Sequence, residues 1–314
     1  MARPLRIEFP GAFYHITARG NEGREIFRSF RDRQQFLSYL ESAVQRYRAV
    51  IHVYCLMDNH YHLLLETPSG NLSQILRHIN GAYTTYFNVK RNRSGHLFQG
   101  RFKAILVAAD EFALELSRYI HLNPVRAGIA DRPEGYPWSS CSYYTGRKKR
   151  PDWLSLDFIL SYFQGRGASS QDQYREFVHD PLAKEGQSPL QGAIASAILG
   201  SSDFVNNIQE KYLACRKADR NLPALKELSK ASLPKILKEA EALFQGDRTL
   251  ARKAALYLCH RFSGRTLKEI GHYFGIGESA VSQASRRFEG RLEQERVLRE
   301  KVLALGVKAR LCNV

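Results

Sequence analysis

Two histidines separated by one residue stand at the start of a short apolar run. Residues 57–66 read MDNHYHLLLE, and Thr67-Pro68 ends the run, which predicts a buried strand. Side chains alternate along a strand, so His60 and His62 should share one face, about 7 Å apart at the backbone. Two imidazoles at that spacing can bind one metal ion. The alternative is a pair of ordinary half-buried polar residues at a strand end.

A second stretch, residues 117–126, reads SRYIHLNPVR. Tyr119 and Asn123 are four residues apart, so they share one face of a predicted helix. A tyrosine hydroxyl can act as a nucleophile, and an amide oxygen is a hard metal ligand. On the alternative interpretation, Tyr119 is a core aromatic residue and Asn123 caps the end of the helix.

The two stretches together indicate a more specific chemistry than either alone. A divalent ion held by two imidazoles and one amide oxygen keeps open positions for a phosphate. A tyrosine on a neighbouring helix could then displace a 3′ hydroxyl and remain bonded to the 5′ phosphate. The covalent link would conserve the bond energy, so that the strand could be rejoined elsewhere.

Length and composition fit a globular protein of two domains. The chain has 314 residues, of which 44% are hydrophobic and 11% aromatic. No apolar run approaches the ~18 residues of a membrane span, and the N-terminus lacks an apolar signal segment. The five cysteines are scattered and form no C-x-x-C pair, so we expect neither disulfides nor a cysteine zinc site. We therefore expect a cytoplasmic protein with no membrane partner.

The positive charge is divided between two blocks of the chain. Residues 1–150 contain 22 Lys and Arg against 12 Asp and Glu, a net charge of +10. Residues 151–246 contain 11 against 12, and residues 247–314 contain 14 against 7, so the net charges are −1 and +7. Two basic blocks around a neutral one favour two nucleic-acid surfaces over a generally basic exterior.

The order of predicted elements in the first block is β-α-β-β-α-β-α. Strands are expected at 11–19, 50–57, 60–66 and 101–108. Helices are expected after Asp32 and Asp110, each taken as a helix cap, and from Asn71. Pro124 is expected to end the last helix. This order predicts an α+β fold, a ferredoxin-like antiparallel sheet with helices on one face.

Four segments of this block resemble a known family. They are Arg19 to Asn21, Met57 to Glu66, Gly95 to Lys103, and Tyr119 to Gly128. The His60-Tyr61-His62 motif with a downstream tyrosine resembles the single-tyrosine transposases of the HUH endonuclease superfamily, and the four segments resemble its REP-associated tyrosine transposases. The resemblance extends over residues 1 to about 145, and we assign a catalytic domain to 1–148.

The resemblance implies a ferredoxin-like HUH domain that acts on single-stranded DNA with hairpins and uses Mg²⁺ or Mn²⁺. It implies that Tyr119 is the catalytic nucleophile and that His60 and His62 bind the metal. Asn123 matches the position of a third ligand, where some relatives have glutamine. Relatives often act as homodimers, with active sites built from one chain or two, and the sequence leaves this choice open.

Basic and polar residues around these motifs are candidates for DNA contacts. A cationic loop interleaved with aromatic residues is typical of single-strand binding, although a solvated charged loop has the same composition. Arg19 and Asn21 can make bidentate contacts to bases. The candidates in the first block are Arg19, Asn21, Lys90, Arg91, Arg93, Arg101, Lys103 and Arg126. His15, His96 and His121 are interpreted as structural.

The remainder divides into a spacer and a second DNA-binding region. Residues 149–246 show helical patterns and no chemistry, so a helical spacer is expected there. In residues 247–314, helices at 250–262, 266–274 and 278–288 with a Gly275-Ile276-Gly277 turn predict an all-α helix-turn-helix domain. It resembles the DNA-binding domain of the chromosomal replication initiator, although a plain helical hairpin is the alternative. The residues expected in the major groove of duplex DNA are Ser279, Ser282, Gln283 and Arg286.

The sequence thus predicts a metal-dependent transposase that cleaves and rejoins single-stranded DNA through a 5′-phosphotyrosine. Two alternatives remain open. One is an HUH replication initiator or relaxase, which shares the chemistry and differs in its target. The other is a catalytically silent DNA-binding regulator, against which the intact His60, His62 and Tyr119 argue.

Overall fold

The computed structural model describes residues 5–164, 168–180, 188–213 and 232–309. The chain forms two compact units, one made of residues 6–205 and the other of residues 1–5 with 206–314. The first unit therefore includes more than fifty residues of the segment predicted as a spacer. None of the described helices combines the length and apolar character needed to cross a lipid bilayer.

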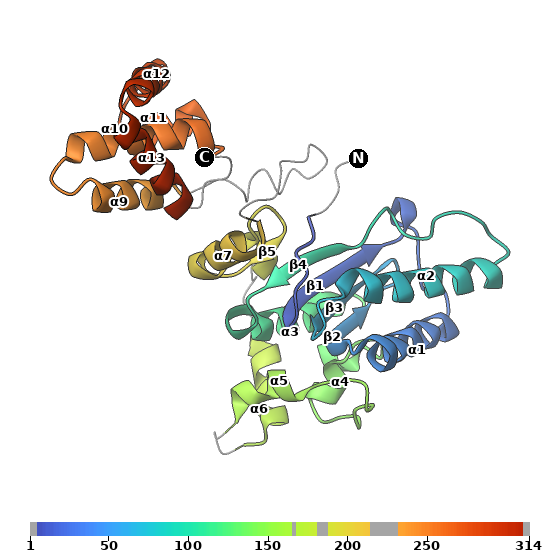
Figure 1. Cartoon of the computed structure of the whole chain (residues 1–314). Helices are drawn as coiled ribbons and strands as arrows, with labels where there is room; N and C mark the ends of the chain where they lie inside the picture. Colours follow the sequence, from blue (N-terminus) through green and yellow to red (C-terminus); the bar gives the residue numbers. More distant parts are fainter. Residues whose placement is uncertain (1–4, 165–167, 181–187, 214–231, 310–314) are drawn as a thin grey trace. The chain divides into compact units, whose positions relative to one another are not determined.

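A five-stranded sheet forms the centre of the first unit (Figure 1). The strand order is β2-β3-β1-β4-β5, and the three pairs among the first four strands are antiparallel. This confirms the predicted ferredoxin-like arrangement. The strands are β1 (Ala12–Arg19), β2 (Val50–Leu56), β3 (His60–Thr67), β4 (Lys103–Val107) and β5 (Ile198–Leu199).

The fifth strand comes from the predicted spacer and pairs in parallel with β4. The amide of Leu106 donates to Ala197 O, and that of Ala108 donates to Leu199 O, both at 2.8 Å. These bonds satisfy backbone groups that an unpaired edge strand would expose. A two-residue strand leaves too short a pattern for sequence-based prediction.

Helices cover both faces of the sheet (Figure 1). The helices α1 (Phe30–Tyr47) and α2 (Leu72–Lys90) cover one face, and α3 (Ala109–Arg126) packs against β2 and β3 on the other. The prediction of helices on one face is therefore wrong for α3. The reason is visible in β3, where Leu63, Leu64 and Leu65 are all buried, so that both faces must be covered.

Two helix boundaries differ from the prediction. Ser29, rather than Asp32, caps α1, because its hydroxyl accepts from the amide of Asp32. The helix α3 begins at Ala109, with Asp110 in its first turn, and continues past Pro124 to Arg126. Proline is tolerated there because only one helical hydrogen bond is lost in the last turn.

Shorter elements complete the first unit and lead into the second. They are the 3-10 turns Asn21–Gly23, Pro133–Gly135, Ser161–Phe163 and Pro189–Gly192, the helices α4 (Cys141–Tyr144), α5 (Asp157–Leu160), α6 (Ser170–His179) and α7 (Ser202–Ile208), and the π-helix Gln209–Leu213.

The C-terminal unit is helical, as predicted. Its helices are α9 (Leu233–Leu243), α10 (Arg248–Phe262), α11 (Leu267–Phe274), α12 (Glu278–Gln294) and α13 (Arg296–Lys308). All five contribute to one apolar core. The core includes Ile270, Phe274 and Val281.

A buried polar network joins α3 to α6. The His121 ring makes 2.7 Å hydrogen bonds to the Tyr174 hydroxyl through Nδ1 and to Ser140 Oγ through Nε2. The Tyr174 hydroxyl also pairs with Ser117 Oγ at 3.0 Å. His121 is therefore structural, as the sequence suggests, and residues from the predicted spacer hold the helix that contains Tyr119.

We predict that His121 makes the first unit acid-sensitive. Burial lowers the pKa of His121 to about 3, whereas an unfolded histidine has a pKa near 6.5. The unfolded chain takes up this proton first, so the contribution of His121 to stability is lost as the pH falls below about 6.5. The free energy of unfolding falls for both proteins between pH 7 and pH 5, and we expect the fall to be about 2 kcal/mol smaller for His121→Gln than for the wild type.

The measurement is urea unfolding followed by tryptophan fluorescence. The chain has two tryptophans, Trp138 and Trp153, and both lie in the first unit. The exposed His96 provides a control, since His96→Gln should keep the pH dependence of the wild type. Equal pH dependence in His121→Gln and wild type would contradict the assignment.

Candidate active site

The two histidines of β3 face the α3 side of the sheet. The ring centroids of His60 and His62 are 4.9 Å apart, so they share one face, as the alternation predicts. Tyr61 points to the opposite face, where its ring packs against Phe36 of α1 and its hydroxyl donates to Asn80 Oδ1 of α2. Tyr61 is therefore a packing residue, and the two imidazoles are left together.

Each histidine has one ring nitrogen in a hydrogen bond. His60 Nδ1 lies 2.6 Å from Asn59 Oδ1, and Asn59 Nδ2 donates to Gly23 O. This second bond fixes the Asn59 amide with its oxygen toward His60, so His60 Nδ1 must be the donor. The lone pair of His60 is therefore on Nε2. His62 Nδ1 lies 3.0 Å from His15 Nε2, and the two rings stack.

The free edge of His62 has the properties of a metal ligand. Its Nε2 atom is buried and has no hydrogen-bond partner. Burial, and then the neighbouring His15 and His60, lower the pKa of His62 well below its ordinary value. Burial and Arg19 outweigh Asp58 and lower the pKa of His60 as well. Both rings are therefore neutral at pH 7, which is the form that binds metal.

Tyr119 lies beside His62 and His15. Its ring centroid is 6.1 Å from that of His62 and 6.2 Å from that of His15, edge-on in both cases. The Tyr119 side chain is half-buried, so a DNA strand can approach it. The exposed Arg126, one of the predicted DNA contacts, holds its guanidinium 5.2 Å from the Tyr119 ring centroid. A phosphate at Tyr119 would therefore have a cation beside it.

Asn123 folds back on its own helix. Its Nδ2 atom donates to Tyr119 O at 2.9 Å and to Ile120 O at 3.3 Å. Residue 124 is proline, so Ile120 O has no amide donor one turn ahead, and the Asn123 side chain takes that place. Since both acceptors are carbonyls, the nitrogen must face the helix, and Oδ1 is directed away from these carbonyls. Half-buried Asn123 can thus offer an oxygen ligand.

His60, His62 and Asn123 would offer a small divalent ion two neutral imidazoles and one amide oxygen as donors. Within the described ranges, no cluster of three His, Cys, Asp or Glu side chains forms a metal site. The described residues therefore give no sign of an ion bound by three such side chains. A set of three mixed donors would leave further positions open for water or phosphate.

Two of the predicted DNA contacts have a structural partner. The carboxylate of Asp32 is buried and pairs with both Lys90 and Arg91. Burial raises the pKa of Asp32, but hydrogen bonds from Lys90, Arg91, Arg28 and Ser29 outweigh it and hold the pKa below the ordinary value. Lys90 and Arg91 therefore join the end of α2 to the start of α1, and their contact with DNA stays a prediction.

The remaining candidates in the first unit come from two places, the end of β1 with the turn after it and the segment from the end of α2 to the start of β4. Arg19 is exposed and pairs across the sheet with His60. The exposed Asn21 donates its backbone amide to Leu97 O at 2.9 Å. Arg101 and Lys103 are exposed, and Arg93 is half-buried near the ring of Phe87.

The C-terminal candidates lie on one face of α12. Ser279, Gln283 and Arg286 are exposed and Ser282 is half-buried. Thr266 and Glu269 form a capping box at the start of α11, and Gly275 ends it in a left-handed conformation. A Cβ on Gly271 would lie 2.5 Å from Ile276 O, so only glycine lets the turn approach α11 this closely.

Sequence reasoning missed two residues of this site, His15 and Asn59. Both contact the outer nitrogen of a candidate ligand. Asn59 is adjacent to His60, so a local side-chain acceptor could have been considered. His15 comes from β1, and only the pairing of β1 with β3 places it beside His62.

Comparisons with known proteins match the part of the chain that contains this site. Residues 9–123 match the family model described as "Transposase IS200 like". The matched range includes His60, His62, Tyr119 and Asn123, and the predicted resemblance to insertion-sequence transposases is thereby confirmed for this part of the chain. The match covers residues 9–123, which is less than half of the chain.

Among solved structures, a similar chain is described as "Structure of the REP associates tyrosine transposase bound to a REP hairpin". The two chains are 17% identical, with a TM-score of 0.41, over 49% of this chain and 92% of the other. No curated protein matches the chain.

We predict that His15 sets the metal affinity of the site. Loss of a partner to the outer nitrogen of a metal-binding histidine typically weakens metal affinity 10- to 100-fold. We therefore expect His15→Leu to weaken Mn²⁺ binding by about that factor, and His15→Gln to retain more of it because Gln can still pair with Nδ1. Titration of Mn²⁺ followed by electron paramagnetic resonance measures this directly.

The control for this titration is His78→Leu. His78 lies on α2 and pairs with Ser42, away from the candidate ligands. The His78→Leu variant should bind Mn²⁺ with the affinity of the wild type. An Mn²⁺ affinity of His15→Leu equal to that of the control would show that His15 does not act on the metal.

Proposed function

We propose that the protein cleaves and rejoins single-stranded DNA through a covalent bond between Tyr119 and a 5′ phosphate. The observation that supports this most is the position of the Tyr119 ring over His62, within a domain that matches IS200-like transposases. The substrate we propose is a single strand that contains a hairpin, as in the transposase whose structure was solved with a REP hairpin.

The reaction balances without an external reductant or energy source. The Tyr119 hydroxyl oxygen attacks phosphorus, and the bond from phosphorus to the 3′ oxygen breaks. The tyrosine proton is lost and the leaving oxygen gains one, so a 3′ hydroxyl is released. In the reverse direction, a 3′ hydroxyl of another strand attacks the phosphotyrosine, which rejoins DNA and restores Tyr119.

The residues of the site have separate tasks in this scheme. His60, His62 and Asn123 would hold a Mg²⁺ or Mn²⁺ ion, which when bound polarises the phosphodiester for in-line attack. Arg126 offers its charge to a phosphate beside the Tyr119 ring. The network of His121, Tyr174 and Ser117 holds α3 in position from the side of α6.

We infer that one chain is enough to assemble the site. Tyr119 faces His62 of its own sheet, and α3 is tied to α6 of the same unit. A homodimer is therefore not required to bring the nucleophile to the histidines. We propose that one chain performs the cleavage step by itself.

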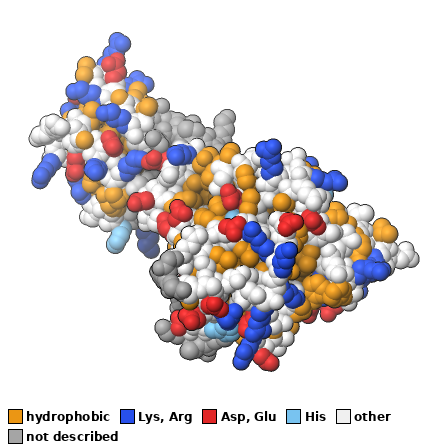
Figure 2. Space-filling view, turned by 90° about the horizontal axis from the view of Figure 1, so that it is seen from below, with side chains coloured by type: hydrophobic (Ala, Val, Ile, Leu, Met, Phe, Trp, Pro, Cys, Tyr) orange, Lys and Arg blue, Asp and Glu red, His pale blue; other side chains and the backbone are white. Residues whose placement is uncertain are grey.

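We further propose that α11 and α12 bind duplex DNA as a helix-turn-helix. The support is the capped pair of helices around Gly275, the exposed Ser279, Gln283 and Arg286, and the net charge of +7 in residues 247–314. Figure 2 shows Lys and Arg side chains interspersed with carboxylates on the face of this unit that it presents.

We predict that Tyr119→Phe abolishes the covalent protein–DNA adduct, because the variant lacks the attacking oxygen. A labelled hairpin oligonucleotide with Mg²⁺ and denaturing gel electrophoresis provide the test. Tyr39→Phe is a matched control and should form the adduct, because the half-buried Tyr39 lies on α1 with its ring edge-on to His78 of α2. An adduct that persists in Tyr119→Phe would exclude Tyr119 as the nucleophile.

We predict that Arg286→Ala weakens duplex binding by the full-length protein. Loss of one phosphate contact should make the negative slope of log affinity against log salt less steep by about 0.9. Loss of a base contact should instead weaken discrimination between sequences by about 1–3 kcal/mol. Binding to a duplex library at several salt concentrations separates these cases. Lys301→Ala on α13 serves as the charge-matched control, and equal effects of the two changes would contradict a specific role for Arg286.

A further inference from the structure

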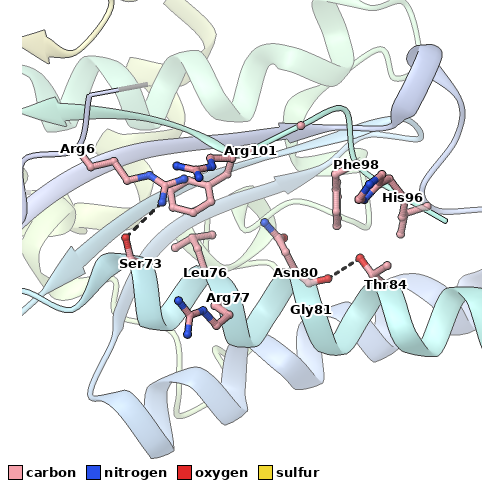
Figure 3. Close-up of a pocket in the computed structure, with 13 residues that line it drawn as sticks. Arg6, Ser73, Leu76, Arg77, Asn80, Gly81, Thr84, His96, Phe98 and Arg101 are labelled. Atoms are coloured by element: carbon pink, nitrogen blue, oxygen red, sulfur yellow. Dashed lines mark hydrogen bonds between the residues drawn. The ribbon is translucent and has the colours of Figure 1, made fainter. Parts of the chain in front are cut away.

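A second cleft lies on the α2 side of the sheet, away from the candidate ligands. Its volume is about 590 Å³, within the ~300–1,000 Å³ of typical ligand pockets. It lies between α2 and the segment 96–102, with Arg6 at one end (Figure 3). The Tyr61 hydroxyl, which donates to Asn80 in this cleft, marks the face of β3 opposite to His60 and His62.

One wall of the cleft is a single face of α2. Ser73, Arg77, Asn80 and Thr84 follow one another at intervals of three or four residues. The Asn80 oxygen is occupied by Tyr61, which leaves its amide nitrogen as a donor to a ligand. Gly81 lies on the same wall, and a Cβ built there meets nothing within 4 Å.

The opposite wall is a loop fixed to the end of β1. The amide of Asn21 donates to Leu97 O, and that of Gln99 donates to Arg19 O, at 2.9 and 2.8 Å. The loop presents the half-buried Phe98 and the exposed His96 to the cleft (Figure 3). These backbone bonds make the aromatic wall a preformed surface rather than one that must order on binding.

The cleft is strongly cationic. Arg6, Arg77 and Arg101 line it, and none of its 13 lining residues is Asp or Glu. Arg77 and Arg101 have no carboxylate partner among the described residues. The Arg6 guanidinium lies 3.9 Å from the Phe102 ring centroid, and burial and Arg101 lower the pKa of Arg6 against the opposing effect of Glu8. An anion between these guanidinium groups would relieve their mutual repulsion.

We propose that this cleft binds one unstacked nucleotide of the DNA strand, with its base against Phe98 and its phosphate toward Arg77 and Arg101. An aromatic face beside arginines that have no carboxylate partner, here Arg77 and Arg101, is the combination that single strands use, since every unpaired base can stack. The proposal rests on the proposed function, because it takes the ligand to be the substrate strand. The nucleotide held here is not the one cleaved, since Tyr119 lies on the other face of the sheet.

The test uses the full-length protein and a 12-nucleotide oligothymidylate that contains one 2-aminopurine. Stacking on Phe98 should quench the 2-aminopurine fluorescence. The Gly81→Leu side chain should fill the cleft without a clash. Because leucine has a higher helix propensity than glycine, the melting temperature of this variant should be at or above that of the wild type. We expect Gly81→Leu to abolish the quenching and to weaken binding about 5- to 100-fold, the factor for one stacked base.

Arg77→Ala should weaken binding several-fold and lower the salt slope by about 0.7, the value for one single-strand phosphate contact. Its control is Arg46→Ala, which removes another exposed arginine, from α1 and outside the cleft. Wild-type quenching and affinity in Gly81→Leu, or equal effects of Arg77→Ala and Arg46→Ala, would overturn the proposal. The proposal would also be overturned if free thymidine monophosphate displaced the oligonucleotide with an affinity equal to that of the oligonucleotide, because the cleft would then be a mononucleotide site.

The result is independent of whether Tyr119 is the nucleophile. Tyr119→Phe should quench 2-aminopurine like the wild type, since its ring and the cleft are intact. The wild type could form no covalent adduct and yet show quenching that Gly81→Leu abolishes. This result would refute the proposed cleavage and support nucleotide binding in the cleft. A wild type that forms the adduct without cleft-dependent quenching would do the reverse.

Discussion

The antiparallel pairing of β1 with β3 is the constraint on which the site depends. It places Arg19 opposite His60 and Thr17 opposite His62, and it brings His15 within hydrogen-bond distance of His62. A slip of one residue would turn every side chain of β3 to the other face. His60 and His62 would then enter the apolar layer beneath α1 and α2, and Tyr61 would face Tyr119. The buried leucines on both faces of β3 make the correct register strongly preferred.

The helix that contains Tyr119 is held by polar bonds on its far side. His121, Tyr174 and Ser117 are fully buried and satisfy one another, so rotation of α3 would leave buried groups without partners. At the end of the same helix, Pro124 removes one backbone donor and the Asn123 side chain replaces it. A sequence feature that usually ends helices thus orients a candidate ligand in this one.

Positive charge has two uses in the first unit. Lys90 and Arg91 both pair with the buried Asp32 and join two helices, so this ion pairing holds their side chains within the fold. Arg77 and Arg101 have no such partner and line an open cleft, and Arg126 lies beside the candidate nucleophile. Net charge alone could not distinguish these groups, because burial and pairing decide how much of each charge is available to a phosphate.

The sequence by itself determined the order of strands and helices, the shared face of His60 and His62, and the pairing of Tyr119 with Asn123 on one helix. These follow from local rules, because side chains repeat every two residues in a strand and every 3.6 in a helix. Only the tertiary structure decided that α3 covers the second face of the sheet, that β5 completes it, and that His15 and Asn59 orient the histidines. It also decided that Lys90 and Arg91 pair with Asp32 while Arg77 stays open to the cleft. Those contacts join residues far apart in the chain, and their geometry depends on register and packing, which no local pattern encodes.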